Sequence, residues 1–227
     1  MNSIYFDCSR GLSGPMLVGA LCDLGVAPSA LEWDLGQVDV GEFHTHFERV
    51  TEDGLTGVKF SIHAGAVHTP EQDESHPTGH AHDHEHQHDH DSSEGGHDHE
   101  PHDQDAAAVH PVDKLIASVE ASGLSDPVKS RVVTVFARLG QTHDALSLIE
   151  AAAVICASAA LHALKPERVA FFCREGTMDA TVDSGAAFAA EFVSTSAPLP
   201  ALPAARVGHG IGSDGQSMSA LIAEVAA

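Results

Sequence analysis

Residues 76–102 carry the side chains best suited to metal chemistry. Asp or Glu fills many of the gaps between the histidines of this segment. Neutral imidazole nitrogen binds Ni, Zn, Cu and Co, and neighbouring carboxylates add negative charge. The composition therefore predicts a segment that binds transition metals and leaves the identity of the metal open. The candidate ligands are His76, His80, His82, His84, His86, His88, His90, His97, His99 and His102.

The same segment cannot contribute to a hydrophobic core. It has almost no apolar side chains and no aromatic residue, so we expect residues 66–110 to form a disordered insert. The alternative to metal binding is a solvated spacer whose histidines have no role. We expect residues 1–65 to form a strand, loop, helix and hairpin, and residues 111–227 to be the helical and mixed α/β remainder of the same domain.

A second group of residues could bind an anion. Residues 3–7 read as a buried strand, residues 8–14 as a Gly/Ser loop, and residues 15–24 as a helix. This order aims backbone N–H groups at a phosphate or carboxylate. The candidate ligands are Ser9, Arg10, Ser13 and Gly14. The alternative is a tight turn that needs glycine for its backbone angles.

Charge and cysteine content limit the partners of the chain. The net charge is −22, and the insert contributes −12 of it because it holds twelve acids and no Lys or Arg. This balance argues against binding to nucleic acids and to anionic membranes. None of the four cysteines forms a C-x-x-C pair, which favours a reducing cytoplasm over a disulfide scaffold or zinc knuckle. The sequence leaves homo-oligomerisation open.

The remaining periodicity predicts a mixed α/β fold, a small sheet packed with several helices. Alternation in residues 43–49 and 58–62 indicates a hairpin with His44, His46 and His63 on one polar face. These histidines are either a second metal-binding face or solvent-facing residues. We expect further helices at 29–35, 113–121, 126–139, 141–164 and 184–192, and strands at 168–173, 206–211 and 219–225.

Residues 5–21, YFDCSRGLSGPMLVGAL, resemble the opening of the LarC family of nickel-insertion proteins, D-C-x-x-G-I-S-G-D-M. Residues 53–60, 183–187 and 207–212 are also similar to segments of that family, in the same order. The resemblance implies insertion of nickel into a pyridinium bis-thiocarboxylate mononucleotide, with CTP consumed. It also implies that His143, Asp144 and Cys8 are candidate catalytic residues, where nickel would meet this precursor, and that the Gly/Ser loop would face a phosphate.

The chain departs from the family pattern in several places. Pro15 replaces the usual aspartate, and Ile149 and Ala153 stand where two later aspartates are expected. By comparison with the family pattern, we expect a segment that follows the helix of Ile149 and Ala153 to be missing between Val169 and Asp179, and the half tied to CTP use to be absent from this chain. We therefore expect either a nickel insertase that needs a separate CTP-binding polypeptide or a non-catalytic cytoplasmic buffer or metallochaperone for Ni or Zn.

Overall fold

The computed structural model describes residues 2–65, 109–173, 183–195, 204–212 and 216–224. The ten histidines of residues 76–102 and residues 66–108 of the expected disordered insert lie outside the described residues, whereas Val109 and His110, expected in the insert, form part of a short strand because they pair with residues 146 and 147. Among the described helices, none is long and apolar enough to cross a membrane.

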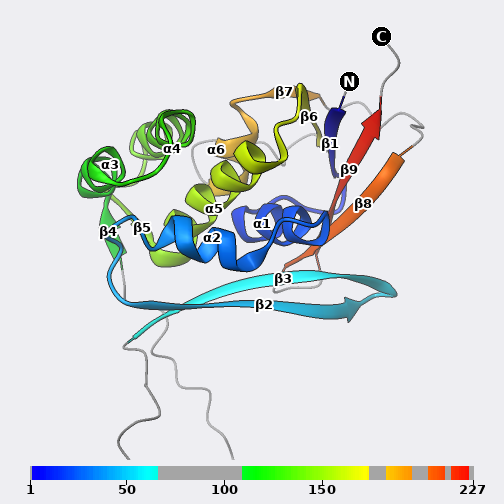
Figure 1. Ribbon diagram of the computed structural model, residues 1–227, viewed down its shortest axis with the longest axis horizontal. Helices are drawn as coiled ribbons and strands as arrows, with labels where there is room; N and C mark the ends of the chain where they lie inside the picture. The colour runs from blue at the N-terminus through cyan, green and yellow to red at the C-terminus, as the bar shows by residue number, and fades with distance from the viewer. Residues whose placement is uncertain (1, 66–108, 174–182, 196–203, 213–215, 225–227) are drawn as a thin grey trace, which may run out of the picture.

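The described strands form one seven-stranded mixed sheet with the order β2-β3-β8-β9-β1-β6-β7. Strand β1 lies between a parallel neighbour, β6, and an antiparallel neighbour, β9. The sheet curves around the central helices (Figure 1). The strands are β1 (Asn2–Cys8), β2 (Phe43–Glu52), β3 (Leu55–Ala64), β6 (Arg168–Cys173), β7 (Val193–Thr195), β8 (Ala204–Ile211) and β9 (Ser217–Glu224).

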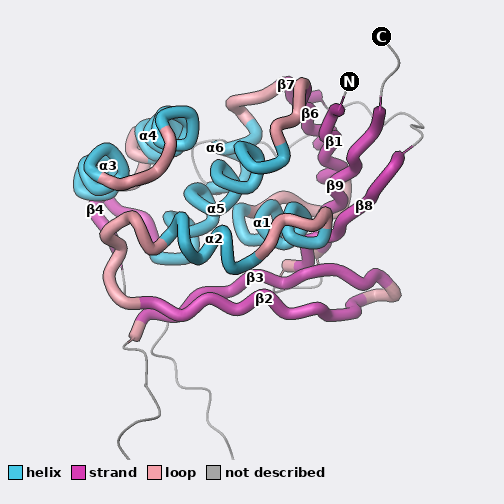
Figure 2. The backbone as a smooth tube through the Cα atoms, viewed as in Figure 1, coloured by secondary structure: helices cyan, strands magenta, loops and turns pink. Residues whose placement is uncertain are grey.

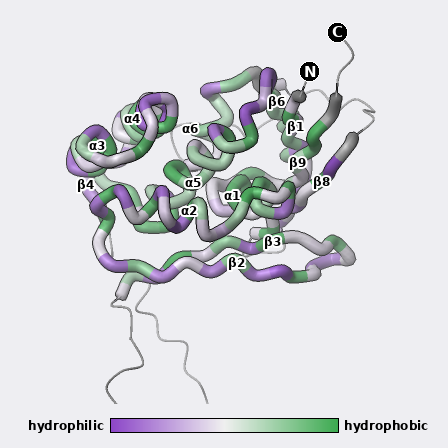
Figure 3. Tube along the Cα trace, in the orientation of Figure 1, coloured by the Kyte–Doolittle hydropathy of each residue, from purple (hydrophilic) through white to green (hydrophobic). Residues whose placement is uncertain are grey.

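Two apolar helices fill the centre of the molecule. Helix α5 (Leu148–Leu164) is buried over most of its length because nearly every residue from 151 to 161 is small or apolar. Helix α1 (Gly14–Asp23) lies directly on the sheet, where Gly210 of β8 faces the Met16 carbonyl so closely that a Cβ atom would clash. Hydrophobic residues accordingly concentrate in α1 and α5 (Figure 3).

The other helices enclose this centre. They are α2 (Pro28–Leu35), α3 (Val112–Ala121), α4 (Asp126–Leu139) and α6 (Ser184–Ala189). A small second sheet pairs β4 (Val109–Pro111) with β5 (Ala145–Ser147) (Figure 2). One continuous hydrophobic cluster contains residues from both sides of the insert, including Phe6 and Phe136.

Several predictions from the sequence are confirmed. The fold is mixed α/β, the helix at 126–139 and the strand at 168–173 have the expected bounds, and residues 43–64 form a hairpin. Asp53 and Gly54 both have positive φ angles at the tip of this hairpin. That backbone geometry matches the right-handed twist of the two strands and favours an Asp-Gly pair.

The single helix expected at 141–164 is wrong at its start. Residues 145–147 pair with β4 as a strand, and the helix begins only at Leu148. Ser147 caps it, because its hydroxyl accepts the Glu150 N–H (3.4 Å) while the Glu150 carboxylate accepts the Ser147 N–H (2.9 Å). His143 and Asp144 therefore do not lie at a helix start. The helix expected at 184–192 also ends earlier, at Ala189.

Candidate functional site

The carboxyl edge of the parallel strands β1 and β6 is the first candidate region. Cys8 ends β1, residues 9–13 form the loop, and α1 begins at Gly14. This confirms the predicted order of strand, loop and helix. Ligands of open α/β sheets bind beyond the carboxyl ends of such strands.

The loop after β1 is held by its own backbone. The Ser9 N–H donates to Asp7 Oδ1 (3.0 Å), and the Gly11 N–H donates to the Cys8 carbonyl (3.2 Å). Gly11 has a φ of 148°, which favours glycine, and a Cβ there would lie 2.5 Å from Gln216 Oε1. A tight turn is thus sufficient to explain why residue 11 is a glycine. The side chain of Arg10 is exposed.

Helix α6 covers the start of α1. The Ser13 hydroxyl accepts the Met16 N–H (3.4 Å) and caps α1, so one of its lone pairs is already used. A Cβ on Gly185 would lie 2.6 Å from the Ser13 carbonyl carbon and 2.9 Å from the Gly14 nitrogen. Close helix packing therefore explains Gly14 and Gly185. The phosphate site of Ser9, Arg10, Ser13 and Gly14 stays a prediction.

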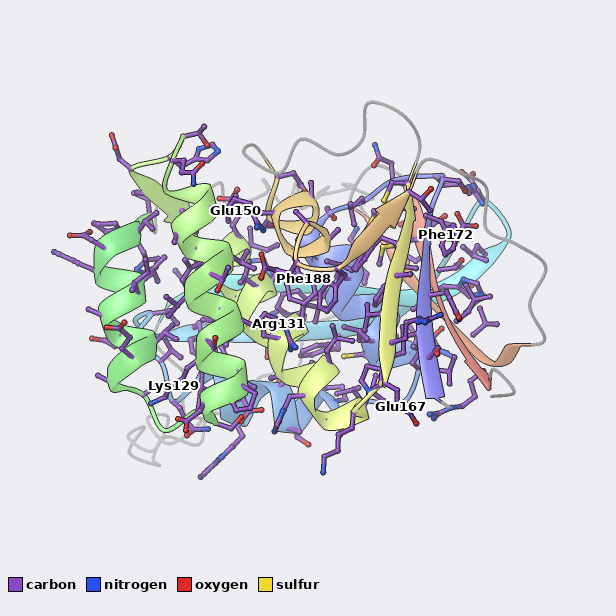
Figure 4. All side chains as sticks on the ribbon, turned by 90° about the horizontal axis from the view of Figure 1, so that it is seen from above. Lys129, Arg131, Glu150, Glu167, Phe172 and Phe188 are labelled. Atoms are coloured by element: carbon purple, nitrogen blue, oxygen red, sulfur yellow. The ribbon has the colours of Figure 1, made fainter. Side chains whose placement is uncertain are left out.

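Asp183 joins the same edge by capping α6. Its carboxylate accepts the N–H groups of Gly185 (2.7 Å) and Ala186 (2.9 Å). Burial raises the pKa of this carboxyl above its ordinary value, and the nearby Glu150 adds to the increase. Figure 4 shows Glu150 on α5 beside α6. The edge thus contains a partly buried acid that caps α6.

Cys8 lies beneath this edge among other sulfur atoms. Its side chain is fully buried, and its Sγ lies 3.7 Å from Met218 Sδ on β9. Cys173 is its partner in register on β6. Hydrogen bonding between the two thiols, together with burial, raises the pKa of Cys8, whereas the same bond lowers the pKa of Cys173.

His143 and Asp144 lie in a different place, a cavity of about 500 Å³ at the ends of α3 and α4. The His143 N–H donates to the Leu139 carbonyl (3.0 Å), and the Asp144 carbonyl accepts the Val112 N–H (3.0 Å). These bonds fix the loop between α4 and β5. The cavity is lined by Val112, Asp113, Ile116, Ala137, Gly140, His143 and Asp144.

The imidazole of His143 has a buried Nε2 atom with no hydrogen-bond partner among the described residues, as has His110 of β4. A buried nitrogen of this kind can accept a proton or bind a metal ion. Cys8 does not line the cavity of His143 and Asp144. Throughout the described ranges, no three His, Cys, Asp or Glu side chains converge closely enough to hold a metal ion. The transfer site of His143, Asp144 and Cys8 stays a prediction.

The hairpin β2–β3 does present its histidines on one face. His44 of β2 pairs directly with His63 of β3, and the rings of His46 and His63 lie 5.1 Å apart. The face lies close to Gly65, after which the histidine-rich part of the sequence begins. The shared face is confirmed, and its role in metal binding stays a prediction.

Sequence reasoning missed Cys173 and Met218 as neighbours of Cys8. The available signal was that a cysteine follows the strand expected at 3–7 and ends the strand expected at 168–173. Pairing β1 with β6 in register would have placed the two thiols side by side. Nothing in the periodicity of either strand specifies that pairing.

Comparison with known proteins adds a family. Residues 4–183 match the family model described as nickel insertion protein. The chain belongs to this family. No solved structure matches it.

Three relatives illustrate this membership of the nickel insertion family. All three are named pyridinium-3,5-bisthiocarboxylic acid mononucleotide nickel insertion protein. The relative from Desulfitobacterium hafniense is 39% identical over 70 residues, which are 30% of this chain and 17% of that protein. The relative from Geobacillus kaustophilus is 27% identical over 92% of this chain and 40% of its own length, and that from Staphylococcus epidermidis is 24% identical over 93% and 56%.

Proposed function

We propose that this chain binds Ni²⁺ and takes part in nickel insertion into pyridinium-3,5-bisthiocarboxylic acid mononucleotide. The match of residues 4–183 to the nickel insertion family carries this proposal. The ten histidines of residues 76–102 support it, because neutral imidazole is a favoured ligand of Ni²⁺. In this account nickel is the cargo, and the mononucleotide is the acceptor.

The chemistry requires weak, mixed ligands that can release the ion. Imidazoles of residues 76–102 gather Ni²⁺, and the body of the protein receives it. The cavity of His143 and Asp144 is the proposed receiving region, because its lining includes His143, whose Nε2 lacks a partner among the described residues, and Asp113 and Asp144, although these three side chains do not converge into a closed metal site. The loop of Ser9, Arg10, Ser13 and Gly14 would face the phosphate of the mononucleotide.

The chain spans about half or less of the length of the relatives it matches. The proposal for these residues is therefore nickel binding and positioning of the precursor, and CTP use with a CTP-binding partner polypeptide stays a prediction.

One observation favours a second candidate, a nickel or zinc buffer or metallochaperone without chemistry. Ala153 is fully buried, and its Cβ lies 2.8 Å from the place that a Cβ on Gly14 would occupy. Ile149 is half-buried and packs against the core. The face of α5 where the family resemblance places two aspartates is therefore a packing surface in this chain.

A single incubation separates the two candidates. The purified chain is mixed with the metal-free mononucleotide, Ni²⁺ and CTP, with and without a co-purified CTP-binding partner, and the mononucleotide is analysed by mass spectrometry. Insertion predicts a nickel-containing mononucleotide in the complete mixture. A buffer predicts protein-bound Ni²⁺ and an unchanged mononucleotide. A chain that neither binds Ni²⁺ nor changes the mononucleotide contradicts both.

A further inference from the structure

Three sulfur atoms from three neighbouring strands lie in one row at the carboxyl edge of β1 and β6. Cys8 ends β1 and pairs in register with Cys173, which ends β6. On the other side of Cys8, Asp7 pairs with Ser219, so that Met218 of β9 lies level with Cys8. The distance from Cys8 Sγ to Met218 Sδ is 3.7 Å. We call Met218, Cys8 and Cys173 the sulfur row.

The row faces the helices and not the far side of the sheet. The aromatic pair Phe6 and Phe171, two residues earlier on β1 and β6, stacks at 4.5 Å on the same side. All three sulfur side chains are at most 4% exposed and belong to the same hydrophobic cluster as α1 and α5. Figure 4 shows Phe172, the residue before Cys173, at the end of β6 beside β1.

The position of the row distinguishes it from ordinary core packing. Ser9 and Arg10, immediately after Cys8, are exposed, so the row lies one residue below the surface at the edge where open α/β sheets bind ligands. Two thiols that can lose their protons and one thioether provide soft donors on backbone fixed by sheet hydrogen bonds.

From this geometry we infer that the sulfur row is a binding site for one Ni²⁺ ion, held by the thiolates of Cys8 and Cys173 and the thioether of Met218. The choice of nickel as the ion rests on the proposed function. Binding releases one proton from each thiol, and no electron is transferred. The site differs from the imidazoles of residues 76–102 in ligand chemistry and from the cavity of His143 in position.

The experiment uses the full chain, reduced and without oxygen, titrated with NiCl₂ alone and followed by near-ultraviolet absorption. Sulfur-to-metal charge transfer absorbs strongly there, whereas imidazole and carboxylate ligands give no comparable band. Nickel bound by the histidine-rich segment therefore does not contribute to the signal. We expect a charge-transfer band whose intensity stops increasing when one Ni²⁺ ion is bound in the sulfur row of each chain. Cys8→Ser and Cys173→Ser should each abolish it, and Met218→Leu should weaken binding about tenfold or more.

Cys22→Ser is the matched control. Cys22 is half-buried near the end of α1 and lies on none of the three strands that carry the sulfur row. The band should survive this change. Absence of the band in the unaltered chain, or its persistence in both single cysteine variants, would overturn the inference and show that the row only packs the core.

A second measurement covers the case in which a serine variant does not fold. Iodoacetamide labelling of the unaltered chain, read by peptide mass spectrometry, should show Ni²⁺ protecting Cys173 at least several-fold while Cys22 is unaffected. Equal labelling with and without Ni²⁺ also overturns the inference. A missing band with intact nickel insertion rejects the sulfur row alone, and a band without insertion rejects the proposed function alone.

Discussion

The histidines of the β2–β3 hairpin and the cysteines at the ends of β1 and β6 occupy opposite environments. His44, His46 and His63 lie on a half-exposed strand face, next to the point where the histidine-rich sequence begins. Cys8 and Cys173 are buried at the carboxyl edge of β1 and β6. Both pairs of strands bring potential nickel ligands into register, but only one of them removes those ligands from water.

This difference in exposure assigns the capture of nickel to the histidines and its retention to the buried cysteines. A partly exposed imidazole can meet an ion that arrives from solvent. A buried thiol must first lose a proton that its surroundings hold, as the raised pKa of Cys8 indicates. We therefore expect histidines to load nickel quickly and reversibly, and the buried edge to exchange it slowly.

Deleting residues 76–102 should have the largest effect on metal binding. Most of the bound Ni²⁺ should disappear, because ten of the eighteen histidines are removed. Elemental analysis after dialysis measures the loss. The midpoint of thermal unfolding should stay the same, since the segment has almost no apolar side chains. Unchanged nickel content would show that the hairpin and the edge, and not this segment, hold the metal.

Gly185→Ala should disrupt the packing at the carboxyl edge of β1 and β6 and leave the β2–β3 hairpin unchanged. The new Cβ would lie 2.6 Å from the Ser13 carbonyl carbon, and backbone at both sites would have to move. We expect the free energy of unfolding to fall by about 1–3 kcal/mol, measured by urea denaturation. Gly36→Ala is the control, because Gly36 has a helical φ of −64° and should change stability little. Equal effects at both glycines would contradict the close packing of α6 on α1.

Asp183→Ala should cost about 1 kcal/mol through loss of the α6 cap, whereas Asp183→Asn should retain the cap. Burial raises the pKa of Asp183, so the folded protein holds this proton at pH values where the unfolded chain has released it. Stability from this group is greatest below the unfolded pKa of about 3.9 and falls as pH rises through the folded pKa. Urea denaturation at several pH values across this range measures how the free energy of unfolding depends on pH. The contribution of residue 183 to this dependence should vanish in Asp183→Asn. An unchanged pH dependence would assign the contribution to another group.

His46→Ala should have the smallest effect on stability, within about 0.5 kcal/mol, since this side chain is exposed. In a chain that also lacks residues 76–102, the same change should lower residual Ni²⁺ binding at pH 7, as measured by calorimetry. Thr51→Ala is a control on the same hairpin, away from the histidine face. A loss of binding in both variants would attribute the effect to the hairpin fold and not to the imidazole.

Local patterns predicted much of the fold. Alternation in the hairpin, the apolar stripe of α4 and the apolar run of β6 each identify an element, because each element buries one face. The start of α5 was predicted too early because β4 pairs with residues 145–147, a contact between segments that are separated in the sequence by helices α3 and α4. Single-sequence periodicity carries no information about such a pairing.

The candidate site was less predictable than the elements around it. Cys8 was identified through the family resemblance, but its neighbours Cys173 and Met218 come from strands far away in the sequence. The role of Gly14 was also ambiguous, since a glycine at a helix start suits both a phosphate and a packed helix. The closeness of Ser184 and Ala153 to Gly14 in the structure shows that packing is sufficient to explain this glycine.

Calorimetric titration of the purified full chain with Ni²⁺ at neutral pH tests the central claim most directly. The account predicts that several Ni²⁺ ions bind at micromolar concentrations and that this binding is lost below about pH 6, where imidazole is protonated. A chain that takes up no Ni²⁺ under these conditions would contradict the account.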